Sequence, residues 1–215
     1  MGSRLIGATL VFLLAVYVGA AEAAEEPMAF SSIGGGTIIA SGGLRSGDAK
    51  RFAAFLGAQS AKVHTVLLHS PGGSLGEGFQ IGRVIRKNGL ATKVGPGDLC
   101  ASACVFMLAG GVVRDALPAS KVGVQMASRA MSDDYLDRLK RILIDRRFDV
   151  DERIRLIVLL NEQAAAQAAA AQATYLSEMG ISLRLLTPSV NTNHMDAYWL
   201  SRDEMRDFNL VNNLD

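Results

Sequence analysis

A mostly apolar, β-branched run, Lys62–Ser70, stands directly before a Pro-Gly-Gly turn at 71–73. Such a run, without regular polar alternation, is typical of a strand buried on both faces of a parallel sheet. The Pro-Gly-Gly sequence forces a turn, and Ser74 with Glu77 has the spacing of a capping box at a helix start. A buried strand that leads through a tight turn into a helix favours an α/β fold with crossover connections.

Three further runs have the length and composition of strands, namely 37–41 (TIIAS), 90–95 (LATKVG) and 120–125 (SKVGVQ). Helix-type segments separate these runs, and the alternation predicts an α/β fold with a parallel sheet. The chain has 215 residues, 49% of them hydrophobic, which suits one domain with a substantial core. We expect that domain to span residues 37–215.

Residues 132–180 differ in character from the rest of the chain. Asp151–Met179 is rich in Ala, Gln, Glu and Leu, which are strong helix formers. We therefore expect a helical excursion from the α/β pattern over 132–180. The Ala-Gln tract at 164–173 would allow close helix packing, within the subunit or between subunits, so this helix is a candidate surface for homo-oligomer formation.

The N-terminus has the layout of a secretory signal peptide. Arg4 supplies positive charge, residues 5–18 are apolar, and Ala-Glu-Ala at 21–23 is a small-x-small cleavage site. We expect cleavage after Ala23, then a flexible segment over 24–36, and export of the mature protein to the periplasm or the exterior. The alternative is an uncleaved membrane anchor, although the apolar run is short for a span.

Charge and motifs exclude several classes of function. The formal net charge is +1, so no strong attraction to nucleic acid or to anionic membranes is expected, nor any membrane attachment after signal cleavage. The histidines and cysteines lack the spacing of a metal site. The phosphate-loop pattern does not occur, and we expect no cofactor.

Both cysteines flank one serine in the stretch GPGDLCASACVFMLAGG. In an oxidising compartment Cys100 and Cys104 can pair, because a helix would bring residues four apart to neighbouring turns. The alternative is that Cys104 is a buried, small apolar residue. We favour the disulfide, which would hold the turn around Ser102 rigid.

The Pro-Gly-Gly turn and the Ser102 turn together suggest acyl-transfer chemistry. Each follows a strand and opens a helix, and ligands of open α/β sheets bind at the carboxyl ends of strands. Ser102 offers a nucleophile and an adjacent N–H group. The glycine turn offers a second unobstructed N–H that could hold a developing oxyanion.

Four segments, in this order, resemble the Clp protease proteolytic subunit and its relatives in the ClpP/crotonase superfamily: LLHSPGGSLGEGFQIGRVIR, GDLCASACVFMLAGG, LPASKVGVQ and YWLSRDEMRDFNLV. More narrowly, the chain is similar to exported bacterial ClpP-like proteins. The resemblance covers Thr37 to about Ser128 and Tyr198–Val211. It implies a spiral of β-β-α units with a parallel sheet, plus a helical C-terminal region.

The resemblance also implies roles for particular residues. Ser102 matches the serine nucleophile, and the N–H groups of Gly72 and Ala103 match the oxyanion-hole donors. The family's histidine position holds Gln125, which is not a general base near neutral pH. The position of the family's acid falls near Ala197, with Asp196 beside it.

Other residues could supply the missing base. His194 lies in the segment that delivers the family's acid, two residues before Asp196, and His69 lies directly before the Pro-Gly-Gly turn. A Ser–Lys dyad, which resembles the signal-peptide peptidases of the same superfamily, would need a lysine of lowered pKa. The lysines available for such a dyad are Lys121 and Lys140. The third histidine, His64, we expect to be structural.

Three functions are consistent with these residues. The first is an exported serine peptidase or related hydrolase that uses Ser102. The second is a catalytically inactive ClpP-like scaffold that binds an extended peptide or a protein partner, and Gln125 favours it. The third, a crotonase-like acyl-CoA enzyme, is disfavoured by the signal peptide, because coenzyme A is a cytoplasmic metabolite.

Overall fold

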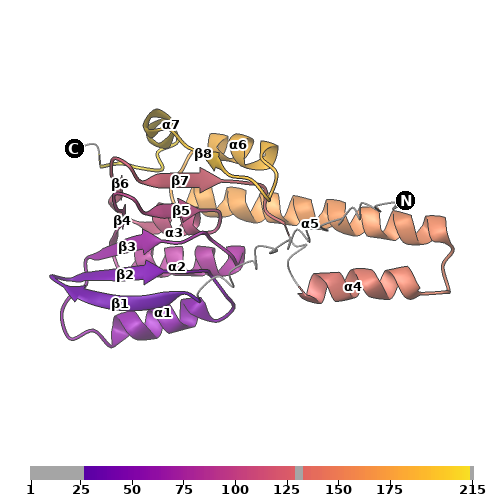
Figure 1. Cartoon of the computed structure of the whole chain (residues 1–215), viewed down its shortest axis with the longest axis horizontal. Coiled ribbons are helices and arrows are strands. Elements are labelled where there is room, and N and C mark those ends of the chain that lie inside the picture. The colour runs from indigo at the N-terminus through magenta and orange to yellow at the C-terminus, as the bar shows by residue number, and fades with distance from the viewer. Residues whose placement is uncertain (1–26, 129–132, 214–215) are drawn as a thin grey trace, which may run out of the picture.

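The computed structural model describes residues 27–128 and 133–213 (Figure 1). A body of two β-sheets and packed helices carries a long arm of two helices to one side. The strands are β1 (Ala29–Gly34), β2 (Thr37–Ser41), β3 (Thr65–His69), β4 (Ala91–Val94), β5 (Leu99–Ala101), β6 (Arg114–Ala116), β7 (Lys121–Val124) and β8 (Tyr198–Trp199). The helices are α1 (Asp48–Gly57), α2 (Leu75–Lys87), α3 (Cys104–Gly110), α4 (Asp133–Ile144), α5 (Val150–Glu178), α6 (Leu186–Asn191) and α7 (Arg202–Asp207), with a 3-10 turn η1 (Leu183–Leu185).

The larger sheet has five strands in the order β1-β2-β3-β4-β6. Strands β2, β3, β4 and β6 are parallel, and β1 is an antiparallel edge strand. The predicted α/β fold with a parallel sheet is therefore confirmed. One face of β3 is buried as expected, since Val66 and Leu68 have no exposed surface. The other face departs from the expected burial on both faces, because Thr65 and Leu67 are only half-buried and His69 is exposed.

The smaller sheet has the order β5-β7-β8, with β5 parallel and β8 antiparallel to β7. An isolated parallel bridge between Ser70 and Cys100 joins the end of β3 to β5. In this bridge the Ser70 N–H donates to the Leu99 carbonyl at 2.8 Å, and the Ala101 N–H donates to the Ser70 carbonyl at 3.0 Å. The bridge sets the turn after β3 beside the turn after β5.

Strand β1 differs from the sequence-based expectation. Residues 29–34 lie within the segment that we expected to be flexible, but they pair with β2 through a hairpin turn. The three glycines at 34–36 all have positive φ, so they form the turn rather than a linker. Phe30 secures the hairpin by packing on Phe52, with ring centroids 5.3 Å apart. The predicted signal peptide lies outside the described residues.

Glu77, which the capping-box spacing assigns to the start of α2, also caps the neighbouring helix α1. Ser74 caps α2 and accepts the Glu77 N–H at 3.5 Å, as the capping box predicts. The Glu77 carboxylate, however, accepts the N–H groups of Gly47 and Ala49 at 3.0 and 2.7 Å. This carboxylate therefore caps the neighbouring helix α1, where Gly47 at the N-cap has no side chain to do so.

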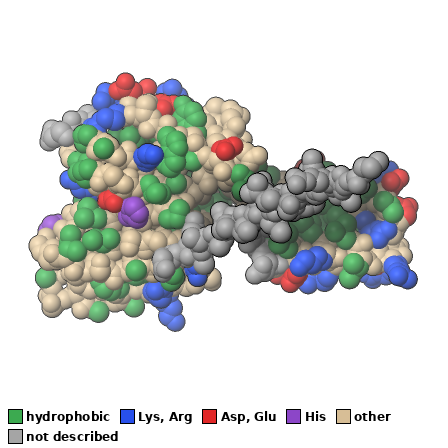
Figure 2. Space-filling model, viewed as in Figure 1, with side chains coloured by type: hydrophobic (Ala, Val, Ile, Leu, Met, Phe, Trp, Pro, Cys, Tyr) green, Lys and Arg blue, Asp and Glu red, His purple; other side chains and the backbone are tan. Residues whose placement is uncertain are grey.

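The arm consists of α4 and the long helix α5 (Figure 1). Of the 29 residues of α5, only Gln172, Tyr175 and Leu176 near its end are buried. Large hydrophobic side chains are exposed along the arm (Figure 2): Leu136, Leu143, Ile144, Phe148, Val150, Ile154, Val158 and Leu159. Even so, the described helices include no segment that meets the length and apolarity needed to cross a bilayer.

Tyr175 anchors the arm to the body. Its ring lies against Phe79 and Phe106, at centroid distances of 4.8 and 5.7 Å, and its hydroxyl donates to the Phe106 carbonyl at 2.5 Å. Burial raises the pKa of this phenol far above its ordinary value. The hydroxyl fits only because residue 82 is glycine, since a Cβ there would collide with it.

This close approach predicts that Gly82→Ala destabilises the protein by about 1–3 kcal/mol through overpacking. Gly76→Ala is the matched control in the same helix, because a Cβ at residue 76 meets no neighbouring atom within 4 Å. The control should gain about 0.5–1 kcal/mol from the helix preference of alanine. Urea unfolding of both variants measures the difference, and equal midpoints would contradict the proposed anchor.

Candidate active site

Ser102 lies at the apex of the turn between β5 and α3. Its φ is +54°, a left-handed conformation that is uncommon for a residue with a side chain. The turn is held to the smaller sheet, because the Ser102 N–H donates to the Gly123 carbonyl at 2.9 Å. Within residues 27–128 and 133–213 the Ser102 hydroxyl has no hydrogen-bond partner, so the fold does not use it.

The Pro-Gly-Gly turn packs directly against Ser102. A Cβ at Gly72 would stand 2.6 Å from the Ser102 Cβ and 2.9 Å from the Ala103 nitrogen. The φ of Gly72 is also +104°, in the region that favours glycine. The structure thus brings together the two turns that the sequence singled out, and only glycine fits at the contact.

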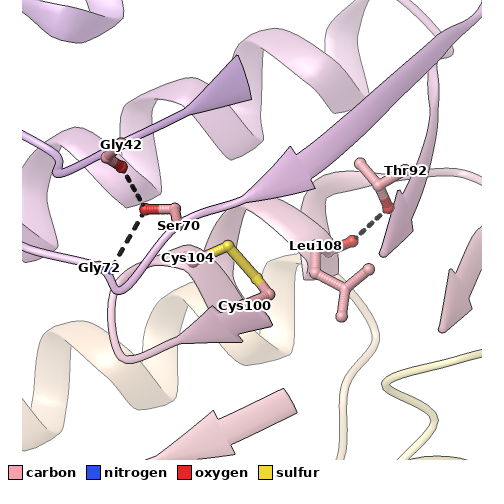
Figure 3. The surroundings of a disulfide bond; sticks show 7 residues. All are labelled: Gly42, Ser70, Gly72, Thr92, Cys100, Cys104 and Leu108. Atoms are coloured by element: carbon pink, nitrogen blue, oxygen red, sulfur yellow. Dashed lines mark hydrogen bonds between the residues drawn. A yellow bond between two sulfur atoms is a disulfide. The ribbon is translucent and has the colours of Figure 1, made fainter. Parts of the chain in front are cut away.

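The oxyanion-hole donors need one correction. The Gly72 N–H, which we expected to be free, donates to Ser70 Oγ at 3.1 Å, and Ser70 Oγ donates to the Gly42 carbonyl at 2.7 Å (Figure 3). In the described part of the chain, neither the Gly73 N–H nor the Ala103 N–H has a hydrogen-bond partner. These two N–H groups are therefore the donors that can serve an oxyanion.

Ser70 was not among the residues singled out from the sequence, and its side chain is fully buried in this turn. The signal was present in the sequence, because a serine two residues before a glycine can bind the backbone N–H of that glycine. Here the local bond engages the Gly72 N–H. The Ser70 hydroxyl thereby links the Pro-Gly-Gly turn to the Gly42 carbonyl.

Gln125 follows β7, the strand whose Gly123 carbonyl binds the Ser102 N–H. The Gln125 backbone carbonyl accepts the Ser189 hydroxyl at 2.8 Å, which fixes this end of the strand. Its side-chain Oε1 is buried and has no partner among the described residues. A buried acceptor without a donor is costly, so Gln125 presents an unused acceptor instead of the imidazole that the family pattern would place there.

His194 and Asp196 lie in a segment that closes around the end of β7. The Met126 N–H donates to the Thr192 carbonyl at 2.9 Å, and Val124 pairs with Tyr198 in the β-ladder. Residues 192–198 therefore leave and rejoin the strand on either side of Gln125. In the described residues the side chains of His194 and Asp196 form no hydrogen bond with Ser102 or with each other.

The other candidate bases contact residues other than Ser102. His64 directly precedes β3, His69 ends β3 and Lys121 begins β7, so all three lie on the body. Lys140 lies on the arm. The contacts are His69 Nδ1 with Asp98 Oδ1 (2.8 Å), His64 Nδ1 with Thr65 Oγ1 (3.1 Å), Lys121 Nζ over the Trp199 ring (5.6 Å) and Lys140 Nζ with Asp137 (3.1 Å).

Cys100 and Cys104 form a disulfide, as the sequence favoured, and their Cα atoms are 5.2 Å apart. The two are not on successive turns of one helix, which was the geometry expected. Cys100 belongs to β5 and Cys104 begins α3, and the bond joins the two elements (Figure 3). Ser102 is the middle residue of the loop that the bond closes. Both cysteines have 0% of their surface exposed, which protects the bond from solvent reductants.

The described residues contain no group of three or more His, Cys, Asp or Glu side chains that could hold a metal ion. The Ser102 turn itself offers a hydroxyl and, with the glycine turn beside it, two backbone N–H groups without partners among the described residues. Such a set can add to a carbonyl and hold the resulting oxyanion if a base removes the hydroxyl proton.

Comparisons with known proteins support the fold. No protein-family model and no curated protein matches the chain. Among solved structures, ClpP1 from Listeria monocytogenes is similar at 17% identity and a TM-score of 0.52, over 82% of this chain and 88% of that chain. A point mutant of the same Listeria protein gives 15% identity and a TM-score of 0.54, over 81% and 88%. The fold is therefore ClpP-like, as the four sequence segments implied.

The disulfide predicts a redox-dependent stability. Closing a loop of this length is worth about 2 kcal/mol in the chain-entropy account. Urea unfolding with dithiothreitol should therefore show a lower unfolding free energy than unfolding without it. The double variant Cys100→Ala/Cys104→Ala is the control and should not respond to the reductant. Intact mass showing two free thiols in the purified, oxidised protein would contradict the bond.

Proposed function

We propose that this chain is an exported serine hydrolase of the peptidase type, with Ser102 as its nucleophile. The observation that carries the proposal is the Ser102 turn itself. A hydroxyl without a partner in the described part of the chain sits in a left-handed turn beside the unengaged N–H groups of Gly73 and Ala103. Strained conformations of this kind concentrate at functional sites, and the ClpP-like fold supports a peptidase-like role.

In this proposal Ser102 Oγ adds to the carbonyl carbon of a peptide or protein substrate. The Gly73 and Ala103 N–H groups donate to the oxygen that becomes negative. The proton of Ser102 passes to a base and then to the leaving amine, which leaves an acyl-serine. Water, deprotonated by the same base, releases the acid and restores Ser102.

His194 is the base that we assign to this scheme, with Asp196 as the acid that could orient it. The assignment rests on the course of residues 192–198, which are attached to β7 on both sides of Gln125. In this proposal the His194 imidazole reaches the Ser102 turn from the 192–198 segment instead of from the position of Gln125. Hydrogen bonds of catalytic groups often tighten only when substrate binds.

Gln125 supports a second function, a ClpP-like scaffold that binds a peptide without cleaving it. The buried Oε1 of Gln125 accepts no hydrogen bond from the described residues. A peptide N–H could supply the missing donor, and the two backbone N–H groups would receive a peptide carbonyl. Affinity that survives Ser102→Ala would mark this function.

We also propose that two or more copies associate through the arm. ClpP-like folds are often oligomeric, and α5 carries a stripe of exposed hydrophobic side chains at Val150, Ile154 and Val158. These residues are four apart and share one helix face. The stripe precedes the Ala-Gln tract that the sequence favoured for close packing, and an exposed apolar patch of this kind marks an interaction surface.

Export to the periplasm or the exterior is part of the same proposal. The Cys100–Cys104 disulfide supports it, because such bonds persist in oxidising compartments and are rare in the cytosol.

The hydrolase proposal predicts covalent labelling by a fluorophosphonate at Ser102, with the label lost in Ser102→Ala. His194→Gln should lower the labelling rate roughly 100- to 10,000-fold, the usual contribution of a general base. Gln125→His should raise it, because it places an imidazole at the family's histidine position. Peptide mapping locates the label. If the wild-type protein takes no label at Ser102, the hydrolase proposal is wrong. If, in addition, Ser102→Ala binds peptides as well as the wild type does, the scaffold function is supported instead.

The arm predicts a change of assembly state. Ile154→Lys/Val158→Lys should convert the oligomer to a monomer, because the substitution places two cations on the exposed stripe. Gln163→Lys is the control, since it adds a charge to the same helix on the face opposite to Ile154. Sedimentation velocity distinguishes the species. A monomeric wild-type protein, or an oligomer that persists in the double variant, would refute association through this stripe.

A further inference from the structure

A second constellation of catalytic residue types lies away from Ser102, at the carboxyl ends of β2 and β3. Ser41 and His69 are direct cross-strand partners in the parallel ladder, so their side chains extend from the same face of the sheet. His69 Nδ1 is 2.8 Å from Asp98 Oδ1. His69 is thus the cross-strand neighbour of Ser41 on β2 and contacts the Asp98 carboxylate on the segment that enters β5.

The positions of all three residues are fixed by backbone hydrogen bonds. The His69 carbonyl accepts the Gly42 N–H at 3.0 Å, directly after Ser41. The Asp98 N–H donates to the Gly95 carbonyl at 3.1 Å, and the Asp98 carbonyl accepts the Lys121 N–H at 2.9 Å. A carboxylate that holds Nδ1 fixes the tautomer and leaves Nε2, on the other edge of the ring, to act as a base.

A cavity of about 360 Å³ adjoins this group. Its lining includes both Ser41 and His69 but not Ser102 or Gln125. The remaining walls come from small or apolar residues, which are Pro27, Ala29, Gly42, Gly43 and Pro71. The volume lies at the lower end of the range for small-molecule sites, which suits a compact ligand with a short apolar part.

Neither Ser41 Oγ nor His69 Nε2 has a hydrogen-bond partner among residues 27–128 and 133–213. Half of the His69 side chain is exposed (47%), as is 37% of that of Asp98, so water reaches the pair. An exposed pair of this kind adds little to stability. The contact between His69 and Asp98 therefore adds little to the stability of the fold. It would, however, orient a base that has a hydroxyl and a cavity beside it.

We propose that Ser41, His69 and Asp98 form a second hydrolytic centre, independent of Ser102, for small esters with short acyl chains. Ser41 Oγ adds to the ester carbonyl while its proton passes to His69 Nε2, and Asp98 stabilises the imidazolium. The alcohol then leaves with the proton from His69, which gives an acyl-Ser41. Water, deprotonated by His69, attacks the acyl group and releases the carboxylic acid, so that Ser41 regains its proton.

The test uses p-nitrophenyl acetate with the full chain in a Ser102→Ala background, which removes the proposed Ser102 activity. Hydrolysis should persist in this variant and fall at least tenfold on adding either Ser41→Ala or His69→Gln. Asp98→Asn should reduce it by an intermediate factor. His64→Gln is the matched control for unspecific imidazole catalysis, because His64 is another exposed strand-side histidine, and it should have no effect.

Rapid quenching followed by peptide mass mapping should find an acetyl group on Ser41 in the Ser102→Ala protein and none in Ser41→Ala. Thermal unfolding of each variant shows that the fold is retained. Hydrolysis that is equal in Ser41→Ala and its parent, or that falls as much in His64→Gln as in His69→Gln, overturns the proposal and leaves the pair as a surface contact. Loss of all hydrolysis in Ser102→Ala alone overturns it too, while supporting the nucleophile of the first site.

Discussion

The contact between Gly72 and Ser102 is the constraint around which the body is organised. Two turns from two different sheets meet there at van der Waals distance, with no room for a side chain at residue 72. The bridge between Ser70 and Cys100 holds the β3 turn from one side, and the bond from the Ser102 N–H to Gly123 holds the β5 turn from the other. The disulfide between Cys100 and Cys104 closes the loop that carries Ser102. Several independent constraints thus converge on one hydroxyl that the fold itself does not need.

Much of the body could be predicted from the sequence because its signals are local. The run TIIAS becomes β2 with the expected bounds, and the strand before the Pro-Gly-Gly turn forms as predicted, although only one of its faces is fully buried. The edge strand β1 was missed because a hairpin turn and a flexible linker have the same glycine-rich composition. The cap of α1 could not be foreseen either, since its carboxylate comes from Glu77, thirty residues away from Gly47.

In the candidate site, too, the features with local sequence signals could be predicted and those that depend on long-range contacts could not. Ser102 and the glycine turn were recognisable from their position between strand and helix, and so was the pairing of Cys100 with Cys104. Which glycine N–H is available depends on Ser70, and a sequence alone does not say whether its hydroxyl turns inward. The pairing of Ser41 with His69 was equally invisible, because it depends on the register between two strands separated by a whole helix. Long-range register is a tertiary property, and the periodicity of one segment does not carry it.

The attachment of α5 near one of its ends has a mechanical consequence. A helix of 29 residues is about 43 Å long, yet it is fastened to the body only near one end, where the Tyr175 phenol reaches the Phe106 carbonyl of α3. The arm is therefore attached at one end to α3, the helix that begins two residues after Ser102. A force on the far end of the arm would therefore be transmitted to α3, next to the Ser102 turn. The proposed assembly surface and the proposed nucleophile are thus connected through α3.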